Sequence, residues 1–569
     1  MAIESPIAVA SGARAWWLGG YRKAWLSQDV MAGLTSAAVV IPKAMAYATV
    51  AGLPPQVGLY TAFVPMVIYA LLGSSRVLSV SSTTTLAILS AAALGAAAPE
   101  GSAVSLVTAG ATLALLVGAM LLLAAALRLG FVANFISEPV LVGFKAGIGL
   151  VIVVDQIPKL LGVHIHKEGF LRDLVTLAQH APDTSLPTLA LAVVLFVMIF
   201  GLEHFVPKAP APLIAIAVAI ALSSLLGLSA AGVEAVGQVP SGLPNWTWPQ
   251  LGLVQALWPA ATGIALMSFT ESIAAARAFK TPGEPPLQPN RELLAVGLAN
   301  VGGSVLGAMS AGGGTSQTAV NRRAGARTQL AALVTAVTAV ATMLVLAPLI
   351  ARMPQAALAA VVIAYSIELI QPKEFAAILR VRAVEFRWAV IACIGVILLG
   401  TLKGIVIAVI MSLLSLVYQS YSPPVYRLGR KRGTNVFRPL SPEYPSDETW
   451  PGLLLVRAEG RVFFANAQRI GDGIMERIEQ TKPRVVVFDC SALLDIEYTA
   501  LKMLMEAEQR LRDNGIALWL AAMNPETRAM AERSGLWDRM GRERLFFNLE
   551  SAVSKYEAQP PAPTAAPAG

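Results

Sequence analysis

Residues 307–321, GAMSAGGGTSQTAVN, lie in an apolar region long enough to cross a bilayer, but their composition does not suit a regular membrane helix. Three consecutive glycines occupy positions 312–314, and glycine permits backbone conformations that other residues avoid. Four hydrogen-bonding side chains, TSQT, follow at 315–318. Irregular backbone at membrane depth is tolerated only where it lines a cavity or is buried in protein. The stretch therefore predicts an interrupted membrane segment.

A second polar stretch, SVSSTTT at 79–85, stands far upstream at the head of another apolar run. Two interrupted segments in corresponding positions of two halves are typical of a transporter's substrate site. The alternative is that both stretches are helix-packing faces, since small residues also pack membrane helices. The three glycines and the recurrence in both halves favour a site.

Composition indicates a polytopic membrane protein. Of 569 residues, 56% are hydrophobic and 14% are charged, whereas soluble domains average about 25% charged residues. Long apolar runs fill the chain up to residue 421, and a more polar tail follows. The two cysteines, Cys393 and Cys490, provide neither a disulfide framework nor a metal cluster. We find no cleavable signal peptide pattern near the N-terminus.

The apolar runs predict fourteen segments that divide as seven and seven. Their approximate bounds are 30–50, 57–73, 81–97, 103–127, 134–154, 186–203, 210–228, 256–276, 292–308, 314–326, 328–351, 355–371, 384–400 and 402–421. Lys and Arg are more frequent in the loops after even-numbered segments, which places both termini in the cytoplasm. The net charge of +8 thus reflects topology and does not indicate nucleic acid binding.

Seven is odd, so the second half is expected to be inverted relative to the first. The third and tenth segments then enter from opposite sides, each as an irregular piece followed by a short helix. Their helix N-termini are expected to face each other near the midplane. Helix N-termini carry partial positive charge and free N–H groups, so they attract anions.

The pattern predicts five regions. They are a cytoplasmic N-terminus (1–29), a transmembrane domain (30–421), a proline-rich linker (422–451), a small α/β domain (452–555) and a disordered Ala/Pro-rich tail (556–569). In the α/β domain, apolar runs at 453–456, 485–488 and 516–520 predict strands. Helical patterns lie near 467–480, 498–513 and 525–534.

Nearly the whole chain resembles the SulP/SLC26 family of anion transporters. The matching stretches are IPKAMAYATVAGLPPQVGLYTAF (41–63), LLGSSRVLSVSSTTTLAIL (71–89), SFTESIAAARAF (268–279), NRELLAVGLANVGGSVLGA (290–308) and GGGTSQTAVN (312–321). The tail resembles a STAS domain through VVVFDCSALLDIEYTALKML (485–504). The resemblance implies a UraA-like fold of 7+7 inverted repeats, a homodimer and an elevator-like motion. A core subdomain (segments 1–4 and 8–11) moves against a gate subdomain (5–7 and 12–14).

Lys43 stands in the first span just after Pro42, which is expected to break the helix. Members of the family usually have an uncharged polar residue at this point, and many read S-R-T where this chain has Ser316, Gln317 and Thr318. We therefore predict that Lys43 supplies the positive charge missing from the tenth segment. An intramembrane lysine is costly and is a functional hypothesis by default. The alternative is a lysine that extends to the membrane interface.

Glu271 lies in the middle of the eighth segment, where family members that bind a coupling cation carry a carboxylate. It is predicted to bind H⁺ or Na⁺, and the alternative is a purely structural ion pair with Lys43. Tyr47 stands one helical turn after Lys43 and matches an aromatic residue at the edge of the family's site.

The remaining predicted anion contacts are the donors at the two helix starts: Thr83, Thr84, Gly314, Thr315 and Ser316. Helix capping is the alternative role for each threonine. His164 and His166 have a spacing that suits metal, but a solvated loop is the better interpretation. No metal site, cofactor or enzyme motif is predicted. Tyr498 stands where soluble STAS relatives carry a phosphorylated Ser or Thr, so a docking or assembly role is expected instead.

The leading hypothesis is a secondary active transporter in the cell membrane that takes up sulfate or a similar small oxyanion with H⁺ or Na⁺. Its expected partners are the anion, the coupling cation, membrane lipid and a second copy of the chain. A bicarbonate or dicarboxylate symporter and an anion exchanger remain alternatives. A membrane-anchored STAS scaffold or sensor without transport is the alternative of a different class.

Overall fold

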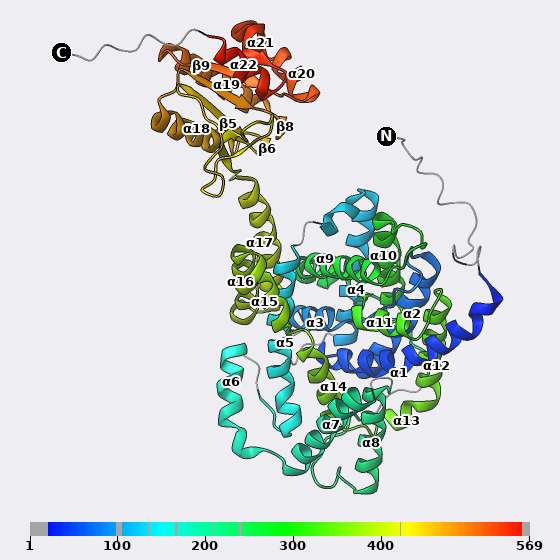
Figure 1. The fold of residues 1–569 in the computed structure, drawn as a ribbon. Coiled ribbons are helices and arrows are strands. Elements are labelled where there is room, and N and C mark those ends of the chain that lie inside the picture. Colours follow the sequence, from blue (N-terminus) through cyan, green and yellow to red (C-terminus); the bar gives the residue numbers. More distant parts are fainter. Residues whose placement is uncertain are drawn as a thin grey trace. The chain divides into compact units, whose positions relative to one another are not determined.

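We describe a computed structural model of the chain, which covers residues 17, 21–97, 105–134, 137–165, 169–206, 209–237, 242–421 and 423–559. His166 and most of the predicted N-terminal and C-terminal tails lie outside these ranges. The chain folds into two compact units, a membrane unit up to Leu413 and a second unit from Leu414 onward (Figure 1). Each is described by itself.

Fourteen helices correspond to the fourteen predicted segments, and the last of them continues past Leu413 into the second unit. The first seven are α1 (Leu26–Val50), α2 (Pro55–Leu72), α3 (Thr84–Ala97), α4 (Leu106–Ala126), α5 (Glu138–Leu161), α7 (Leu186–Phe205) and α8 (Ala211–Leu225). The second seven are α9 (Val254–Ala278), α10 (Pro289–Val305), α11 (Thr315–Arg323), α12 (Leu330–Ala341), α14 (Gln355–Ile367), α16 (Ala383–Leu399) and α17 (Thr401–Tyr421). A π-helical turn (Thr342–Leu346) and α13 (Ala347–Ile350) extend α12. Among the described helices, eight are long and apolar enough to cross a membrane.

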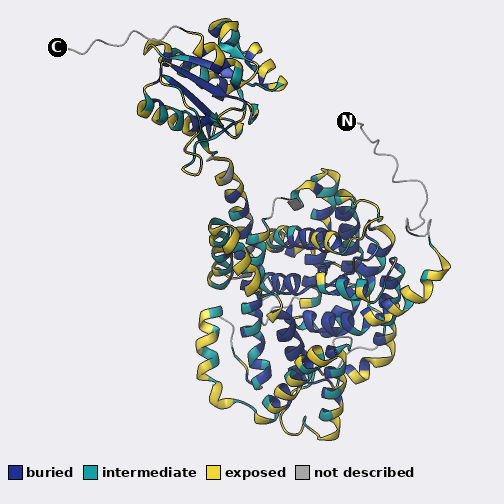
Figure 2. Cartoon of the chain, viewed as in Figure 1, coloured by how far each residue is buried: buried dark blue, intermediate teal, exposed yellow. Residues whose placement is uncertain are grey.

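Two further helices occupy equivalent places in the two halves. They are α6 (Phe170–Gln179), between α5 and α7, and α15 (Pro372–Val381), between α14 and α16. Neither contains a buried residue, and α6 is drawn as largely exposed in Figure 2. Both combine apolar and charged side chains, as helices at a membrane surface do. The sequence analysis left both stretches in the loops between its predicted segments.

The packing divides the membrane unit into two subdomains. In the core, α1 packs against α2 and α12, while α4 packs against α9 and α10. In the gate, α5 packs against α14 and α16, and α7 packs against α8 and α14. The subdomains meet where α1 contacts α8 and α14.

Small residues allow the helices to approach closely, as they commonly do in membranes. A Cβ added to Gly58 of α2 would lie 2.0 Å from the carbonyl oxygen of Ala44 in α1. A Cβ on Gly143 of α5 would lie 1.9 Å from the carbonyl oxygen of Ala389 in α16. No side chain larger than hydrogen fits at either position.

The prediction that Pro42 breaks the first span was wrong. The helix α1 continues through Pro42 to Val50. Proline removes one backbone donor and so leaves the carbonyl of Ala38 without its usual helical partner. The surrounding residues of α1 are buried against other helices, and this packing holds the helix together.

The second unit contains a six-stranded sheet in the order β10-β9-β7-β5-β3-β4. The strands β5 (Leu453–Ala458), β7 (Val485–Asp489), β9 (Ala517–Ala521) and β10 (Leu545–Phe546) are parallel, and β3 (Val425–Arg430) is antiparallel to β5. A separate parallel pair consists of β6 (Gly460–Val462) and β8 (Leu493–Ile496). The helices are α18 (Ala467–Thr481), α19 (Tyr498–Asp513), α20 (Pro525–Arg533), α21 (Leu536–Met540) and α22 (Leu549–Glu557).

Alternate residues of the central strands build two apolar cores. Leu454, Val486 and Leu518 face α18–α21, whereas Leu453, Val485 and Trp519 face α22. Successive side chains of a strand point to opposite faces of the sheet, and here both faces are covered by helices, so both sets of residues are apolar.

The stretch interpreted as a linker, 422–451, contains two of these strands. Hydrogen bonds join β3 to β5, and β4 (Phe437–Pro439) pairs with β3. The prolines that suggested a linker stand beside the strands or, like Pro439, at the outer strand β4, where a missing N–H donor is tolerated.

Candidate functional site

The two interrupted segments meet as a pair of short antiparallel strands in the middle of the core. Val80 of β1 (Val80–Ser81) pairs with Gly313 of β2 (Gly312–Gly313), and Ser81 pairs with Gly312. Each strand leads directly toward a short helix, α3 or α11. The prediction of irregular backbone followed by a short helix in both halves is therefore confirmed.

The crossing leaves no room for a side chain at positions 312 and 313, so glycine is required there. A Cβ on Gly313 would lie 2.7 Å from the Cα of Ser272 in α9 and 2.8 Å from Leu78 Cδ1. A Cβ on Gly312 would lie 2.9 Å from Ser268 Oγ. These serines also hold the strand: Ser268 Oγ donates to the carbonyl of Ala311 at 2.7 Å, and the Gly313 N–H donates to Ser272 Oγ at 2.8 Å.

Gln317 links the two halves and is fully engaged. Its side-chain carbonyl accepts a hydrogen bond from Ser81 Oγ at 2.7 Å, and its amide nitrogen donates to the Ser82 carbonyl at 3.0 Å. The side chain is buried. The residue at the place of the family's usual arginine therefore fastens α11 to the strand before α3.

Lys43 is almost completely buried, with 2% of its surface exposed, so it does not extend to the interface. Its Nζ donates to Ser316 Oγ, in the first turn of α11, at 3.1 Å. The same Nζ lies 3.4 Å from the ring centroid of Tyr365 in α14. Glu203 of α7 and Glu368, just after α14, act on it electrostatically. The lysine thus contacts the tenth segment, as its predicted role requires.

Glu271 accepts hydrogen bonds from the two threonines beside the start of α3. Thr83 Oγ1 lies 3.1 Å from one carboxylate oxygen, and Thr85 Oγ1 lies 2.8 Å from the other. Both Lys43 and Glu271 belong to the described residues, and no ion pair joins them there. The alternative of a structural ion pair is therefore not realised in this structure.

The other predicted contacts lie at the two helix starts. Thr84 begins α3, and the Thr83 hydroxyl accepts from the Leu86 N–H at 3.3 Å, so Thr83 also caps this helix. Gly314 is the N-cap of α11 and provides no side chain for its first N–H groups, whereas Thr315 is exposed. Tyr47 is buried in α1. The free N–H groups at the start of α11 suit an anion.

Ser82, which lies in the chain between β1 and α3, adds another polar group near the crossing. Its hydroxyl is buried and has no hydrogen-bond partner among the described residues. Sequence reasoning missed this residue, together with Tyr365 and Thr85. The sequence signal that could have pointed to Tyr365 is its position as a lone tyrosine near the end of the twelfth apolar segment.

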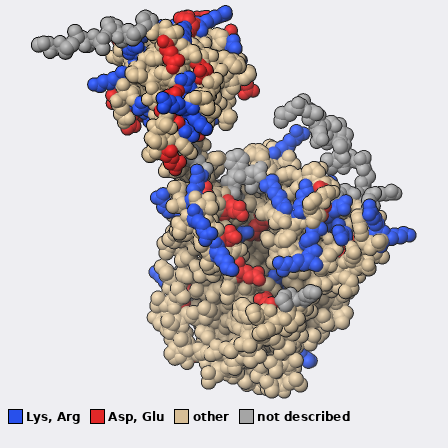
Figure 3. Space-filling model, in the orientation of Figure 1, with Lys and Arg blue, Asp and Glu red and all other residues tan. Residues whose placement is uncertain are grey.

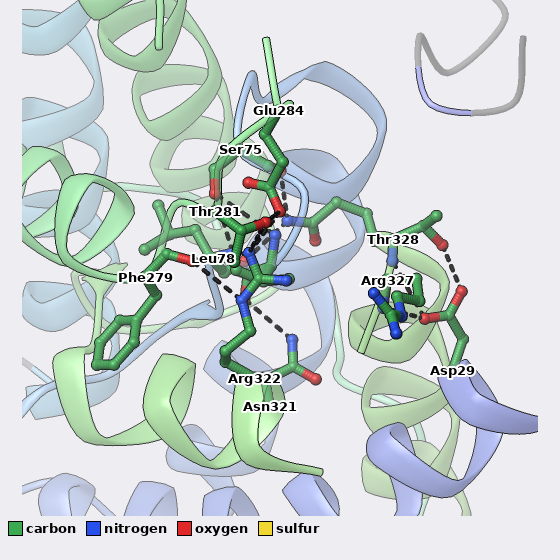
Figure 4. A network of polar contacts seen from close by, with 12 residues as sticks. Asp29, Ser75, Leu78, Phe279, Thr281, Glu284, Asn321, Arg322, Arg327 and Thr328 are labelled. Atoms are coloured by element: carbon green, nitrogen blue, oxygen red, sulfur yellow. Dashed lines mark hydrogen bonds and ion pairs between the residues drawn. The ribbon is translucent and has the colours of Figure 1, made fainter. Parts of the chain in front are cut away.

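A second polar network fastens the ends of the core helices (Figure 4). Arg322 of α11 donates to the carbonyl of Phe279 at the end of α9 through Nε at 3.0 Å and Nη2 at 2.8 Å, and it pairs with Glu284. Asp29 of α1 accepts from the Arg327 N–H and the Thr328 hydroxyl, each at 2.7 Å. The helices that carry Lys43, Glu271 and Ser316 are therefore tied together.

The remaining sequence candidates lie elsewhere. His164 is exposed, and its Nε2 lies 3.4 Å from Glu234. Within the described part of the chain, no group of three His, Cys, Asp or Glu residues suits a metal ion. Tyr498 is exposed at the first residue of α19.

An inverted pair of seven-segment repeats, with two half-helices starting at the crossing, defines a multi-pass membrane transport fold followed by a STAS domain. The chain belongs to the sulfate permease family: residues 26–392 match the model of that family, and residues 444–552 match that of the STAS domain. The family resemblance drawn from the sequence is confirmed.

Named relatives cover nearly the whole chain. "Probable sulfate transporter MT1781" of Mycobacterium tuberculosis is 35% identical over 94% of this chain and 96% of its own length. "Sulfate transporter 4.1, chloroplastic" of Arabidopsis thaliana is 31% identical over 94% of this chain and 81% of its own length.

Solved structures share the fold. The murine Slc26a9 anion transporter in the inward-facing state has a TM-score of 0.86 at 20% identity, with 95% of this chain and 93% of that chain covered. The transmembrane domain of the cyanobacterial bicarbonate transporter BicA has a TM-score of 0.59 at 23% identity, covering 68% of this chain and 98% of that chain.

Proposed function

We propose that the chain takes up sulfate, or a similar small oxyanion, in symport with a proton. The observation that carries this proposal is the meeting of three features at the crossing of β1 and β2. They are the starts of α3 and α11, the buried Lys43 ammonium and the buried Glu271 carboxylate. The names of the sulfate-transporting relatives support the choice of substrate.

The anion is held by positive charge and by donors. Lys43 supplies a full charge, since Gln317 carries none, and Ser316 already holds the ammonium toward α11. The first N–H groups of α11, the Ser82 hydroxyl and Thr84 are the donors nearest the helix starts. Tyr47 and Thr315 complete the proposed site. Charge-assisted hydrogen bonds of this type are about twice as strong as neutral ones.

Glu271 is the proposed coupling residue. An anionic substrate adds negative charge close to its carboxylate, and like charges favour protonation. Substrate and proton then bind cooperatively, and this coupling is reciprocal. The hydroxyls of Thr83 and Thr85 suit both states, because a hydroxyl donates to a carboxylate and accepts from a protonated carboxyl group.

The proposed motion is an elevator-like shift of core against gate. The site residues Lys43, Glu271 and Ser316 belong to core helices that the Arg322 and Asp29 networks tie together (Figure 4). Tyr365 and the acidic residues Glu203 and Glu368 belong to the gate. Substrate that binds Lys43 competes with these gate groups, which loosens the contact between the two subdomains.

We place the protein in the cell membrane as a homodimer with cytoplasmic termini, and assign the STAS domain to assembly. Figure 3 supports this orientation: on the face in view, Lys and Arg gather toward one end of the membrane unit, while the opposite end is almost uncharged.

The test is uptake of labelled sulfate, bicarbonate and succinate into proteoliposomes, each with an imposed proton gradient, a sodium gradient or neither. We expect sulfate to accumulate with an inward proton gradient. Accumulation of bicarbonate or succinate but not sulfate would reassign the substrate. Transport that depends on sodium alone would indicate sodium symport, and transport that depends on a counter-anion alone would indicate anion exchange. No transport of any anion would favour the scaffold or sensor.

A further inference from the structure

A loop of the STAS domain is tied to the point where the chain leaves its last membrane helix. Both belong to the unit that begins at Leu414. Asn466, at the start of α18, donates from Nδ2 to the carbonyl of Ser420 in the last turn of α17 at 3.0 Å. The Arg469 guanidinium lies 5.2 Å from the ring centroid of Tyr421.

Asn466 also fixes the loop that precedes it. Its side-chain oxygen accepts from the Phe463 N–H at 2.9 Å, and its Nδ2 donates to the Arg461 carbonyl at 2.9 Å. The side-chain amide of Asn466 therefore holds the backbone of the loop between β6 and α18 and also links this loop to the end of α17.

The length and composition of α17 indicate that its end lies at a membrane boundary. The helix has 21 residues, and at about 1.5 Å per residue it spans about 30 Å, the thickness of the hydrocarbon core. No charged residue stands between Lys403 and Arg427. Leu416, Val417 and Tyr418 are each about half exposed, so the helix stays apolar on its outer surface up to its last turns. Tyr418 and Tyr421 suit the interfacial level, where tyrosine is enriched.

Phe464 stands two residues before Asn466 and is 68% exposed. Two residues span at most about 7 Å, so Phe464 is held near this boundary. Its only aromatic neighbour among the described residues is Phe463, edge to face at 5.5 Å between ring centroids. An exposed phenylalanine at this depth can leave water by entering the lipid.

We propose that Phe464 inserts into the interfacial layer of the leaflet that α17 leaves, and that Arg469 binds a lipid phosphate there. An aromatic side chain next to a cation is the usual composition of an interfacial contact. Lipid is favoured over a protein partner because the link to Ser420 keeps the loop beside the membrane boundary. Arg461 is not assigned to this contact, since Asp495 and Glu497 already bind it at 3.0 and 2.8 Å.

The matched control is Phe547, which is 91% exposed on the same domain, after β10. Both sites can be labelled singly in a Cys393→Ser background, because Cys490 is buried. Burial, with a smaller effect of Asp489, raises the pKa of the Cys490 thiol and keeps it protonated and unreactive.

The experiment places a nitroxide at Phe464→Cys or Phe547→Cys in the full chain, in vesicles of phosphatidylcholine with or without phosphatidylglycerol. Collision with oxygen, which concentrates in lipid, is compared with collision with a water-soluble nickel chelate. We expect the label at 464 to favour oxygen severalfold more than the label at 547. Arg469→Gln should reduce this preference in vesicles that contain phosphatidylglycerol.

Three results would contradict the proposal, the last of them only in its phosphate contact. Equal nickel accessibility at 464 and 547 would place the loop in water. Protection of 464 from both reagents would show that protein covers it. An unchanged oxygen preference in Arg469→Gln would remove the phosphate contact.

Discussion

Lys43 and Tyr365 connect the two subdomains of the membrane unit: the ammonium of a core helix lies 3.4 Å from the ring centroid of a gate residue. The lysine is held from the core side by Ser316. The only full positive charge among the proposed site residues is therefore shared between the core and the gate.

Replacing Lys43 by Gln should weaken sulfate binding about 10- to 100-fold, since hydrogen bonds to charged groups contribute about 1.5–3 kcal/mol. Equilibrium binding to the purified protein measures this change. Lys280→Gln, an exposed position after α9, is the control and should bind as the parent does. Unchanged affinity in Lys43→Gln would remove the lysine from the site.

Replacing Tyr365 by Leu should strengthen sulfate binding severalfold, because a cation–π contact worth about 0.5–2 kcal/mol no longer competes for Lys43. Tyr365→Phe keeps the ring and should behave as the parent does. Equilibrium sulfate binding to the purified variants measures both changes. A loss of affinity as large as that of Lys43→Gln would instead make Tyr365 a direct ligand of the anion.

Gln317→Arg should destabilise the protein rather than supply a second cation. Arginine has no acceptor, so Ser81 Oγ would lose its 2.7 Å partner and a charge would enter a buried position. We expect a lower midpoint of thermal unfolding and no recovery of binding when the change is combined with Lys43→Gln. Recovered binding in the double variant would show that position 317 reaches the anion.

Gly313→Ala tests the strand crossing. The added Cβ would lie 2.7 Å from a backbone atom of α9, so β2 or α9 must shift. We expect a loss of sulfate binding together with a lower unfolding midpoint. Gly95→Ala in α3 has open space around its Cβ and should be tolerated. Equal behaviour of the two variants would contradict the tight crossing.

Periodicity and glycine content predicted much of the fold, because membrane helices must be long and apolar and an interruption requires special residues. The fourteen segments, the two interruptions and the central strands of the STAS domain follow from such local signals. The helical course of α1 through Pro42 and the strands at 425–430 and 437–439 depend on packing with distant residues. No local pattern reports such packing.

The candidate site was predictable only in part. Lys43 and Glu271 are conspicuous because charge is rare at membrane depth. Their partners are not: Tyr365 is distant in sequence, and Gln317 looked like the loss of a charge although its amide fastens α11 to the strand before α3. Which groups face each other across the core–gate boundary follows from three-dimensional packing alone.

The most direct test of proton-coupled uptake is Glu271→Gln in proteoliposomes, measured as sulfate accumulation under an inward proton gradient and as sulfate exchange without a gradient. Glutamine resembles the protonated carboxyl group, so the variant should still bind and exchange sulfate. Accumulation driven by the proton gradient should be lost. Full gradient-driven accumulation by Glu271→Gln would contradict the account and place the coupling site elsewhere.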